Sequence, residues 1–535
     1  MLFVMRSPWA KRTIWRRLRR PNPRPYSSVN CRDTVATIRF PYSGPLPIPD
    51  ATASRIRTTN PSVNLRVAVV QPLPVPYTEN KPFIPPVHTM RLSCLLLLFL
   101  ASAAPAGWKA GVAVRVITPA EPMWMAGYAS RKTPATGKEH DLTVKALALQ
   151  DPSGAKSVLL TSDLVGVPRS LTEAVAAEVR KKTGLPRERL MITVSHTHCG
   201  PVIADNLSDM YAMPEAEAKK IAPYTRKLQA WMVDAIVQAL TKLEDASVDV
   251  GMGTARFAVN RRRPTPKGVI NEANPDGPVD HDVPVLRVRS AGKVVALVFG
   301  YACHNTTMAY DRWSGDYAGF AMLDLEAKHK GAVAMFWSGC GGDSNPLPRG
   351  KVELCKKYGK ELAGAVNDAL AAKMTPITGE LSAKYRLVAI PLGALPTRAA
   401  LVAESKSPAH AVRKRAEKLL KTLDDKGKLD DHYRHYPIQV WTLGDQVVWI
   451  ALGGEVVVDY SLRLKKELPK GRTLWVTAYA NDVMAYIPSR RVLKEGGYEA
   501  DSSQVYYGQP TKWAPGIEEV IVEGVKATLK EASGK

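Results

Sequence analysis

Apolar segments that end in clusters of polar residues are the feature that most constrains how this chain folds. Five such segments are LMITV before 195–198, VVALVFGYA before 303–306, AVAMFW before 338–343, QVVWIAL before 453–455 and TLWVTAYA before 481–482. Amphipathic stretches alternate with them and predict helices over 214–243, 353–373, 404–423 and 456–467. This alternation predicts a mixed α/β fold. Because ligands bind beyond the carboxyl ends of strands in such sheets, we expect the polar endings to form one site.

The local signals place a strand and a helix in the first part of this pattern. The segment SVLLTSDLVG at 157–166 reads as a strand with a polar end. Ser170 and Glu173 then have the spacing of a capping box, and Gly184 is the expected helix stop. No repeat and no linker follows residue 107, so we expect residues 107–535 to form one large catalytic domain, a mixed sheet with flanking helices.

A second feature is a signal-peptide pattern far from the start of the chain. Met90 and Arg91 precede the apolar run 92–100, and small residues with A-x-A spacing end at Ala106. This run is about half the length of a membrane-spanning helix, which needs ~20 residues. The order of basic, apolar and small residues predicts a signal peptide over 90–106, with a buried core helix as the alternative. We therefore expect an exported protein, periplasmic or secreted.

The segment before it, residues 1–89, differs in composition from the rest. It holds 15 of the 41 prolines and 14 basic residues against three acidic ones. If translation starts at Met90, residues 1–89 are a disordered upstream extension that is absent from the native protein. Removing residues 1–106 leaves 59 basic and 47 acidic residues of the original 74 and 50. That moderate excess predicts no nucleic-acid partner; nucleic-acid binding by the arginine-rich start remains the alternative if that segment is made.

Histidines and a glutamate supply candidate metal ligands. His196 and His198 follow the first apolar run, and on an extended backbone residues i and i+2 point the same way. His304 ends a second run and Glu455 follows two glycines. Two imidazole nitrogens and a carboxylate are a ligand set of catalytic zinc sites. Taken singly, each has a simpler interpretation: a buried hydrogen-bonded histidine, or a carboxylate at a helix start.

Eight motifs together resemble the catalytic domain of the neutral/alkaline, non-lysosomal ceramidase family. They are AGYASR (126–131), SHTHCGP (195–201), NRRRP (260–264), FGYACHNTTM (299–308), SGDYAGFA (314–321), GGDSNP (341–346), GGE (453–455) and AYIPSRRVLKEGGYEA (485–500). Their order and number, spread over most of 107–510, carry the resemblance. It implies a zinc ion with the ligands His196, His304, Glu455 and Tyr486. It also implies three residues that serve the reaction or the substrate: His198, Tyr498 and Arg261.

The resemblance implies an exported zinc-dependent amidohydrolase that uses a metal-activated water to cleave an N-acyl, ceramide-like amide. The expected substrate is a small-molecule or lipid N-acyl amide, as in sphingolipid metabolism. We expect at most peripheral membrane contact and no protein partner. Tyr498 would stabilise the developing oxyanion, His198 would carry the proton to the leaving amine, and Arg261 would hold a polar substrate group.

Two departures from the family pattern leave alternatives open. Asn345 stands where family members usually have a serine that has been proposed as a nucleophile. The chain is also expected to lack the C-terminal β-sandwich of long ceramidases. The alternatives are a zinc hydrolase of the same fold that acts on a non-sphingolipid amide or ester, and a catalytically silent exported binding protein. Asp343 is expected either to orient a histidine or to close a Gly-Gly-Asp turn.

Overall fold

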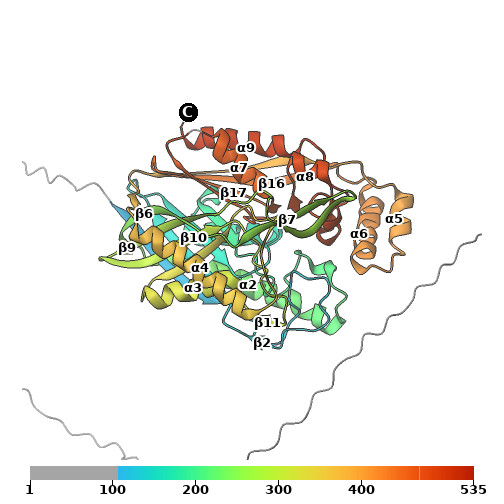
Figure 1. Cartoon of the computed structure of the whole chain (residues 1–535), viewed down its shortest axis with the longest axis horizontal. Helices are drawn as coiled ribbons and strands as arrows, with labels where there is room; N and C mark the ends of the chain where they lie inside the picture. The colour runs from blue at the N-terminus through green and yellow to red at the C-terminus, as the bar shows by residue number, and fades with distance from the viewer. Residues whose placement is uncertain (1–106, 469, 535) are drawn as a thin grey trace, which may run out of the picture. The chain divides into compact units, whose positions relative to one another are not determined.

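Two β-sheets that share one apolar layer form the centre of the protein (Figure 1). The computed structural model describes residues 107–468 and 470–534, so the predictions for 1–89 and 90–106 lie outside it. The larger sheet is mixed and nine-stranded, in the order β12-β10-β9-β6-β1-β3-β4-β5 with β14 paired to β6. Its strands are β1 (Trp108–Val116), β3 (Thr143–Gln150), β4 (Lys156–Ser162), β5 (Leu190–Val194), β6 (Glu244–Thr254), β9 (Asp282–Ser290), β10 (Lys293–Tyr301), β12 (Val333–Ser338) and β14 (Thr375–Pro376).

The smaller sheet has four strands in the order β15-β16-β17-β19. These are β15 (Leu381–Pro391), β16 (His432–Leu443), β17 (Val447–Leu452) and β19 (Thr473–Thr477). Tryptophans from both sheets fill the layer between them: the ring of Trp449 lies 5.6 Å from Trp337 of the large sheet and 5.1 Å from Trp475 of its own. Large aromatic side chains bury much apolar surface each, which ties the two sheets together.

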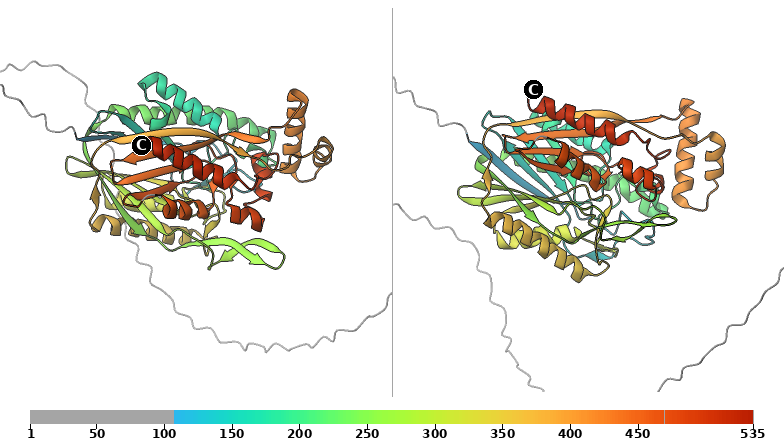
Figure 2. Two further views of the ribbon diagram at one scale, coloured as in Figure 1. Left: turned by 90° about the horizontal axis from the view of Figure 1, so that it is seen from above. Right: turned by 45° about the horizontal axis from the view of Figure 1, so that its top comes forward.

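Helices cover the outer faces of both sheets (Figures 1 and 2). On the large sheet, α2 packs against β1 and β3, α4 against β6 and β9, and α3 against β12; α1 packs on α2. On the small sheet, α9 packs against β15 and β16, and α7 against β19. Their bounds are α1 (Arg169–Thr183), α2 (Glu215–Thr241), α3 (Asp316–Lys328), α4 (Val352–Ala371), α7 (Val458–Glu467) and α9 (Ile517–Ala532).

Several short strands and helices lie in the loops that follow the main strands. Two small pairings matter for the site: β7 (Ala258–Thr265) lies between β8 (Gly268–Asn274) and β13 (Ser344–Pro346), and β18 (Glu455–Val456) pairs with β20 (Tyr486–Ile487). The remaining short elements are β2 (Gly137–Lys138), β11 (Arg312–Trp313), α8 (Arg490–Glu495), and the 3-10 turns η1 (Arg187–Arg189), η2 (Ser208–Met210) and η3 (Ser502–Tyr507).

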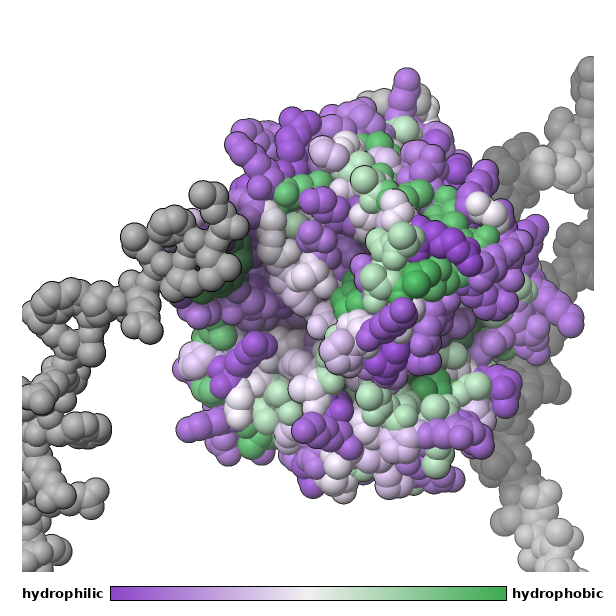
Figure 3. All heavy atoms as spheres, turned by 90° about the vertical axis from the view of Figure 1, so that its right-hand side faces the viewer, coloured by the Kyte–Doolittle hydropathy of each residue, from purple (hydrophilic) through white to green (hydrophobic). Residues whose placement is uncertain are grey.

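A helical hairpin of α5 (Arg398–Glu404) and α6 (His410–Lys426) leaves the small sheet between β15 and β16. It projects to one side of the sheets (Figure 2), and the face seen from that side carries mainly hydrophilic side chains with smaller apolar areas between them (Figure 3). α6 packs against η2 and η3, and Lys418 forms an ion pair with Asp209 there. Within 107–468 and 470–534, no helix is both long and apolar enough to span a membrane.

The mixed α/β fold predicted from the sequence is confirmed, with two local corrections. The helix predicted over 404–423 is present over 410–423 as part of α6, but its predicted start is wrong: the chain breaks at 405–409, where Pro408 removes a backbone donor, and α5 precedes the break. The capping box at Ser170 is also wrong, because α1 begins after Pro168 and the Ser170 hydroxyl bonds the Asp205 carboxylate at 2.8 Å. Gly184, with φ 75°, ends α1 as predicted.

Candidate metal centre

The polar residues that follow β5, β10, β12, β17 and β19 meet at one end of the two sheets. The Ser338 hydroxyl, at the end of β12, donates to the Ser195 carbonyl after β5 at 3.0 Å. The Gly339 amide bonds the Tyr301 carbonyl at the end of β10 at 2.9 Å. The Tyr479 amide, after β19, bonds the Gly454 carbonyl after β17 at 3.0 Å. The five apolar runs therefore end as the sequence predicts, around a shared site.

His196 enters this site through a left-handed backbone turn. β5 ends at Val194, and His196 has φ 57°, a conformation that few residues other than glycine adopt. Its Nδ1 lies 2.6 Å from the Val165 carbonyl, which fixes the ring. The expectation that His196 and His198 converge along an extended strand is wrong in this detail: the turn brings their Nε2 atoms to 3.1 Å.

His304 and Glu455 face His196 across the site. The Nδ1 of His304 lies 2.7 Å from the Gly341 carbonyl, and its Nε2 lies 3.1 Å from Oε2 of Glu455. The Nε2 of His196 lies 3.2 Å from the same oxygen. Burial by itself raises the pKa of the Glu455 carboxyl, so its charged form needs a positive charge beside it. Burial also lowers the pKa of His304 to about 3, so its imidazole is neutral.

Tyr486 reaches the same point because β18 and β20 run parallel in a register that pairs it with Glu455. Its hydroxyl oxygen lies 3.1 Å from Nε2 of His304 and accepts a hydrogen bond from Nη2 of Arg261 at 3.1 Å. Burial raises the pKa of the Tyr486 phenol well above its ordinary value. Ionisation of this phenol in the buried site therefore requires cations beside it.

The donor set matches what a divalent cation needs. A neutral imidazole whose Nδ1–H donates to a carbonyl presents a bare lone pair at Nε2. His196 and His304 both have this arrangement, and their Nε2 atoms face a carboxylate oxygen that accepts no hydrogen bond from any residue in 107–468 and 470–534. Acceptors only 3.1–3.2 Å apart repel unless a cation lies between them. Ligands at about 2.0–2.1 Å from a tetrahedral zinc lie about 3.3 Å apart, close to these separations.

His198 completes a buried group of three histidines, with His196 and His304, whose ring nitrogens lie within 4.8 Å of one another and could hold a metal ion. Its environment differs from theirs, because its Nδ1 bonds no residue in the described ranges. The ring lies on Gly127, where a Cβ atom would stand 2.3 Å from Nδ1, and Arg131 bonds the His198 carbonyl at 2.7 Å. Burial is the largest cause that lowers the pKa of His198 well below its usual value.

Arg261 is buried, and each of its three nitrogens donates a hydrogen bond within the site. Its Nε donates to Glu499 at 2.8 Å and its Nη1 to Asn345 at 3.3 Å, in addition to the bond to Tyr486. A guanidinium has five N–H groups and three are used here, so the expected hydrogen bond to a polar substrate group stays a prediction. The half-buried Tyr498 ring lies 5.3 Å from the ring of Tyr486 and 5.7 Å from the Arg261 guanidinium.

The structure thus brings together all seven predicted residues: His196, His304, Glu455, Tyr486, His198, Tyr498 and Arg261. Their roles as ligands and catalytic groups remain predictions. Asp343 does not orient a histidine: its carboxylate accepts from the Val458 amide at the start of α7 at 2.8 Å and from Asn260 at 3.0 Å.

Sequence reasoning missed two residues that hold the site. The Tyr507 hydroxyl bonds Oε1 of Glu455, and Glu499 bonds both Arg261 and Arg262. Glu499 directly follows Tyr498 in the motif at 485–500, so its position beside a predicted site residue was an available signal. Tyr507 carries no comparable signal, because it lies outside every motif.

Comparison with known proteins adds evidence on the family. The model of the family described as neutral/alkaline non-lysosomal ceramidase, N-terminal, matches residues 108–380. The chain is similar to a crystal structure of neutral ceramidase from Pseudomonas aeruginosa, with a TM-score of 0.61, 19% identity, and 80% of this chain and 75% of that chain covered. A structure described as ceramidase complexed with C2 gives a TM-score of 0.61 and 19% identity over 79% of this chain and 75% of that one. No curated protein matches the sequence.

Proposed function

The chain belongs to the neutral/alkaline non-lysosomal ceramidase family, and from that premise we propose that it is a zinc-dependent amidohydrolase of N-acyl amides. One observation carries the proposal: Oε2 of the buried Glu455 lies between the Nε2 atoms of His196 and His304 and accepts no hydrogen bond from the described residues. The Tyr507 hydroxyl bonds only Oε1, and burying an ionised carboxylate with no charge beside it is costly, so a cation is the missing partner.

His196, His304, Glu455 and Tyr486 would hold the ion, as their distances support. A bound zinc supplies Lewis-acid chemistry, since it polarises a carbonyl group and makes water acidic enough to ionise near neutral pH. The backbone carbonyls behind the two histidines fix the tautomer in which Nε2 is the ligand atom. Arg261 contributes a positive charge beside the Tyr486 oxygen and would hold that oxygen in position.

His198 and Tyr498 lie on the more accessible side of this group. His198 is 8% exposed against 1% for His196 and His304. An imidazole whose pKa lies below its ordinary value is neutral at pH 7, so Nε2 or Nδ1 can accept a proton and pass it to the leaving amine. The Tyr498 phenol keeps its proton because burial raises its pKa, which suits it to donate a hydrogen bond to the amide oxygen as charge develops there.

The proposed substrate is a ceramide-like N-acyl amide, by membership in the family. A serine acyl-enzyme is not part of the proposal. Asn345 stands at the position where family members usually have the serine, and its Oδ1 already accepts a hydrogen bond from Arg261. We further propose export through the segment 90–106, after which residues 107–535 act as the mature enzyme. N-terminal sequencing of the native protein tests this: a first residue near 107 supports it, and one within 1–89 contradicts it.

Zinc content and amide hydrolysis, measured in the purified protein and in two variants, test the proposed metal site. We expect one zinc per chain in the purified protein, and loss of zinc and of amide hydrolysis in Glu455→Ala. Glu353→Ala, an exposed change on α4, is the matched control and should keep both. Full zinc occupancy with undiminished hydrolysis in Glu455→Ala would refute the ligand assignment. N-acylsphingosines and short N-acyl amines, compared as substrates, separate a ceramide-like specificity from another amide.

A further inference from the structure

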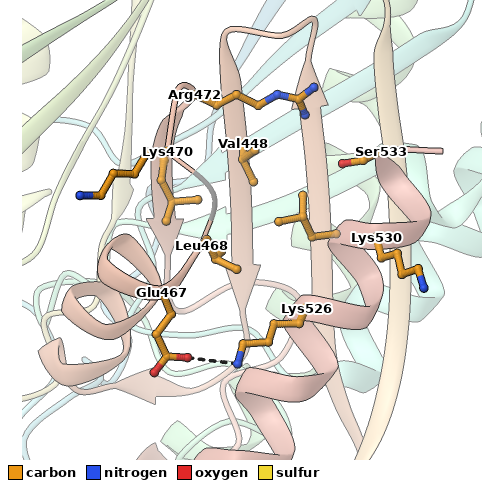
Figure 4. A pocket seen from close by; sticks show the side chains of 10 residues that line it. Val448, Glu467, Leu468, Lys470, Arg472, Lys526, Lys530 and Ser533 are labelled. Atoms are coloured by element: carbon orange, nitrogen blue, oxygen red, sulfur yellow. Dashed lines mark ion pairs between the residues drawn. The ribbon is translucent and has the colours of Figure 1, made fainter. Parts of the chain in front are cut away.

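A pocket of about 520 Å³ lies away from the metal centre, between the small sheet and the C-terminal part of α9 (Figure 4). It is lined by the start of β17 and of β19, by the end of α7 and by the last turns of α9. Val448 at this pocket lies near the start of β17, whereas Glu455 follows the end of that strand at Leu452. The pocket therefore lies near the opposite end of the strands from the metal centre, and its volume is in the range of small-molecule sites.

The centre of the pocket is aliphatic. Val448 and Leu468 belong to the main hydrophobic core, and Leu474 and Leu529 pack against it while remaining partly exposed. Val448 and Leu468 lie in the middle of the view in Figure 4. Partly exposed leucines at the surface of a core gain free energy when an apolar group covers them, at about 25 cal/mol per Å².

Cations surround this aliphatic centre. Lys470, Arg472, Lys526 and Lys530 line the pocket, against one carboxylate, Glu467. In Figure 4, Glu467 and Lys526 point toward one another, whereas the other three cations extend from its other sides.

The acidic groups near the pocket are already paired. Glu467 lies 2.7 Å from Arg463 and 3.1 Å from Lys526, and Asp445 pairs with Arg472. Within the described residues, neither Lys470 nor Lys530 forms an ion pair.

From this arrangement we propose that the pocket binds a long-chain carboxylate, with the aliphatic chain over the four apolar side chains and the carboxylate at the rim, beside Lys470 or Lys530. A ligand with a positively charged head group is disfavoured, because it would face several cations and only one carboxylate, which is already paired. A short anion would leave the leucines uncovered, and a flat bilayer surface would not enter the hollow. The proposal does not depend on the amidohydrolase activity, although hydrolysis of an N-acyl amide releases a molecule of this class.

Photolabelling of the full chain shows which peptides contact the bound long-chain carboxylate. A long-chain fatty acid with a diazirine in its chain should label peptides that contain residues 467–474 and 526–533. Excess dodecanoate should remove this label, whereas dodecylamine and acetate at the same concentration should not. Removal by vesicles of anionic phospholipid alone, with none by dodecanoate, would overturn the proposal in favour of a membrane contact.

Variants of the pocket residues distinguish specific binding of the fatty acid in the pocket from nonspecific adsorption to the protein surface. Lys470→Glu with Lys530→Glu should weaken dodecanoate competition at these peptides by about 10-fold or more, since exposed charge pairs contribute modestly each. Lys357→Glu with Lys360→Glu, two exposed lysines on α4, is the matched control and should leave it unchanged. Leu529→Trp, which fills the pocket, should abolish the label. Equal labelling in all of these variants, or no label in the two segments, would overturn the proposal. Unchanged zinc content and hydrolysis in the pocket variants keep this outcome separate from that of the proposed function.

Discussion

Glu499→Gln is expected to be among the most destabilising single changes around the metal centre. The Glu499 carboxylate bonds Nε of Arg261 at 2.8 Å and also bonds Arg262. The three side chains are 2%, 6% and 1% exposed, so water cannot replace the lost charge. Glutamine keeps the shape but removes the negative charge, and its amide hydrogens would face two guanidinium groups.

The expected loss of unfolding free energy follows from this burial. Breaking a buried ion pair by removing one partner costs about 3–5 kcal/mol, because the remaining charge is left uncompensated. Burial opposes the charge on Glu499, yet Arg261 and Arg262 hold its pKa below the ordinary 4.5. Its contribution to stability is therefore present above pH 4.5 and disappears as pH falls through the lowered pKa. The difference between the two proteins should shrink in acid.

Urea unfolding at pH 7 and at lower pH measures both quantities, with Glu495→Gln as the matched control. Glu495 also pairs with Arg262, but its side chain is 32% exposed, so its loss should cost at most about 1 kcal/mol. In Glu499→Gln, a released Arg261 should also weaken zinc binding by about 10–100-fold in a chelator competition. A loss below about 1 kcal/mol at pH 7, equal to that of the control, would refute the reasoning.

Three further changes have distinct expected outcomes. Gly127→Ala places a Cβ 2.3 Å from Nδ1 of His198 at a φ of 96°, so hydrolysis should fall by about 100-fold while zinc is retained; unchanged hydrolysis would contradict a role for His198. Tyr507→Phe removes the hydroxyl that bonds Glu455, and zinc affinity, measured by chelator competition, should fall at least about 10-fold. Burial raises the pKa of Asp343 from 3.8 to about 6, so its stabilising contribution is full below pH 3.8 and is lost as pH rises through 6. Urea unfolding should show that the unfolding free energy of the parent protein falls by about 3 kcal/mol more than that of Asp343→Asn as the pH rises from below 3.8 to above 6. An identical pH dependence of the unfolding free energy in both proteins would contradict the raised pKa of Asp343.

The site was predictable to the extent that it depends on strands and their ends. Apolar runs followed by His196, His304 and Glu455 are visible in the sequence, and the strands end where these residues begin. What the sequence could not show is how the chain turns after each strand. The left-handed His196 is a tertiary outcome, because neighbouring segments and the Val165 carbonyl hold a conformation that histidine disfavours alone.

The remaining site residues depend on contacts that no local pattern reveals. Tyr486 meets Glu455 through the two-residue pairing of β18 and β20, which is too short for a strand signal. Residue reasoning alone did not select Tyr486; the family resemblance did. Glu499 reaches Arg261 across 238 residues of sequence, and Tyr507 reaches Glu455 across 52. Such partners follow from the packing of whole elements, which is why both were missed.

X-ray diffraction from crystals of the purified full chain, recorded on both sides of the zinc absorption edge, tests the central claim most directly. The account predicts one anomalous peak about 2.0–2.2 Å from Nε2 of His196 and His304, from Oε2 of Glu455 and from the Tyr486 oxygen. A peak that leaves Glu455 or Tyr486 outside bonding distance, or no peak in protein that hydrolyses an N-acyl amide, would contradict it.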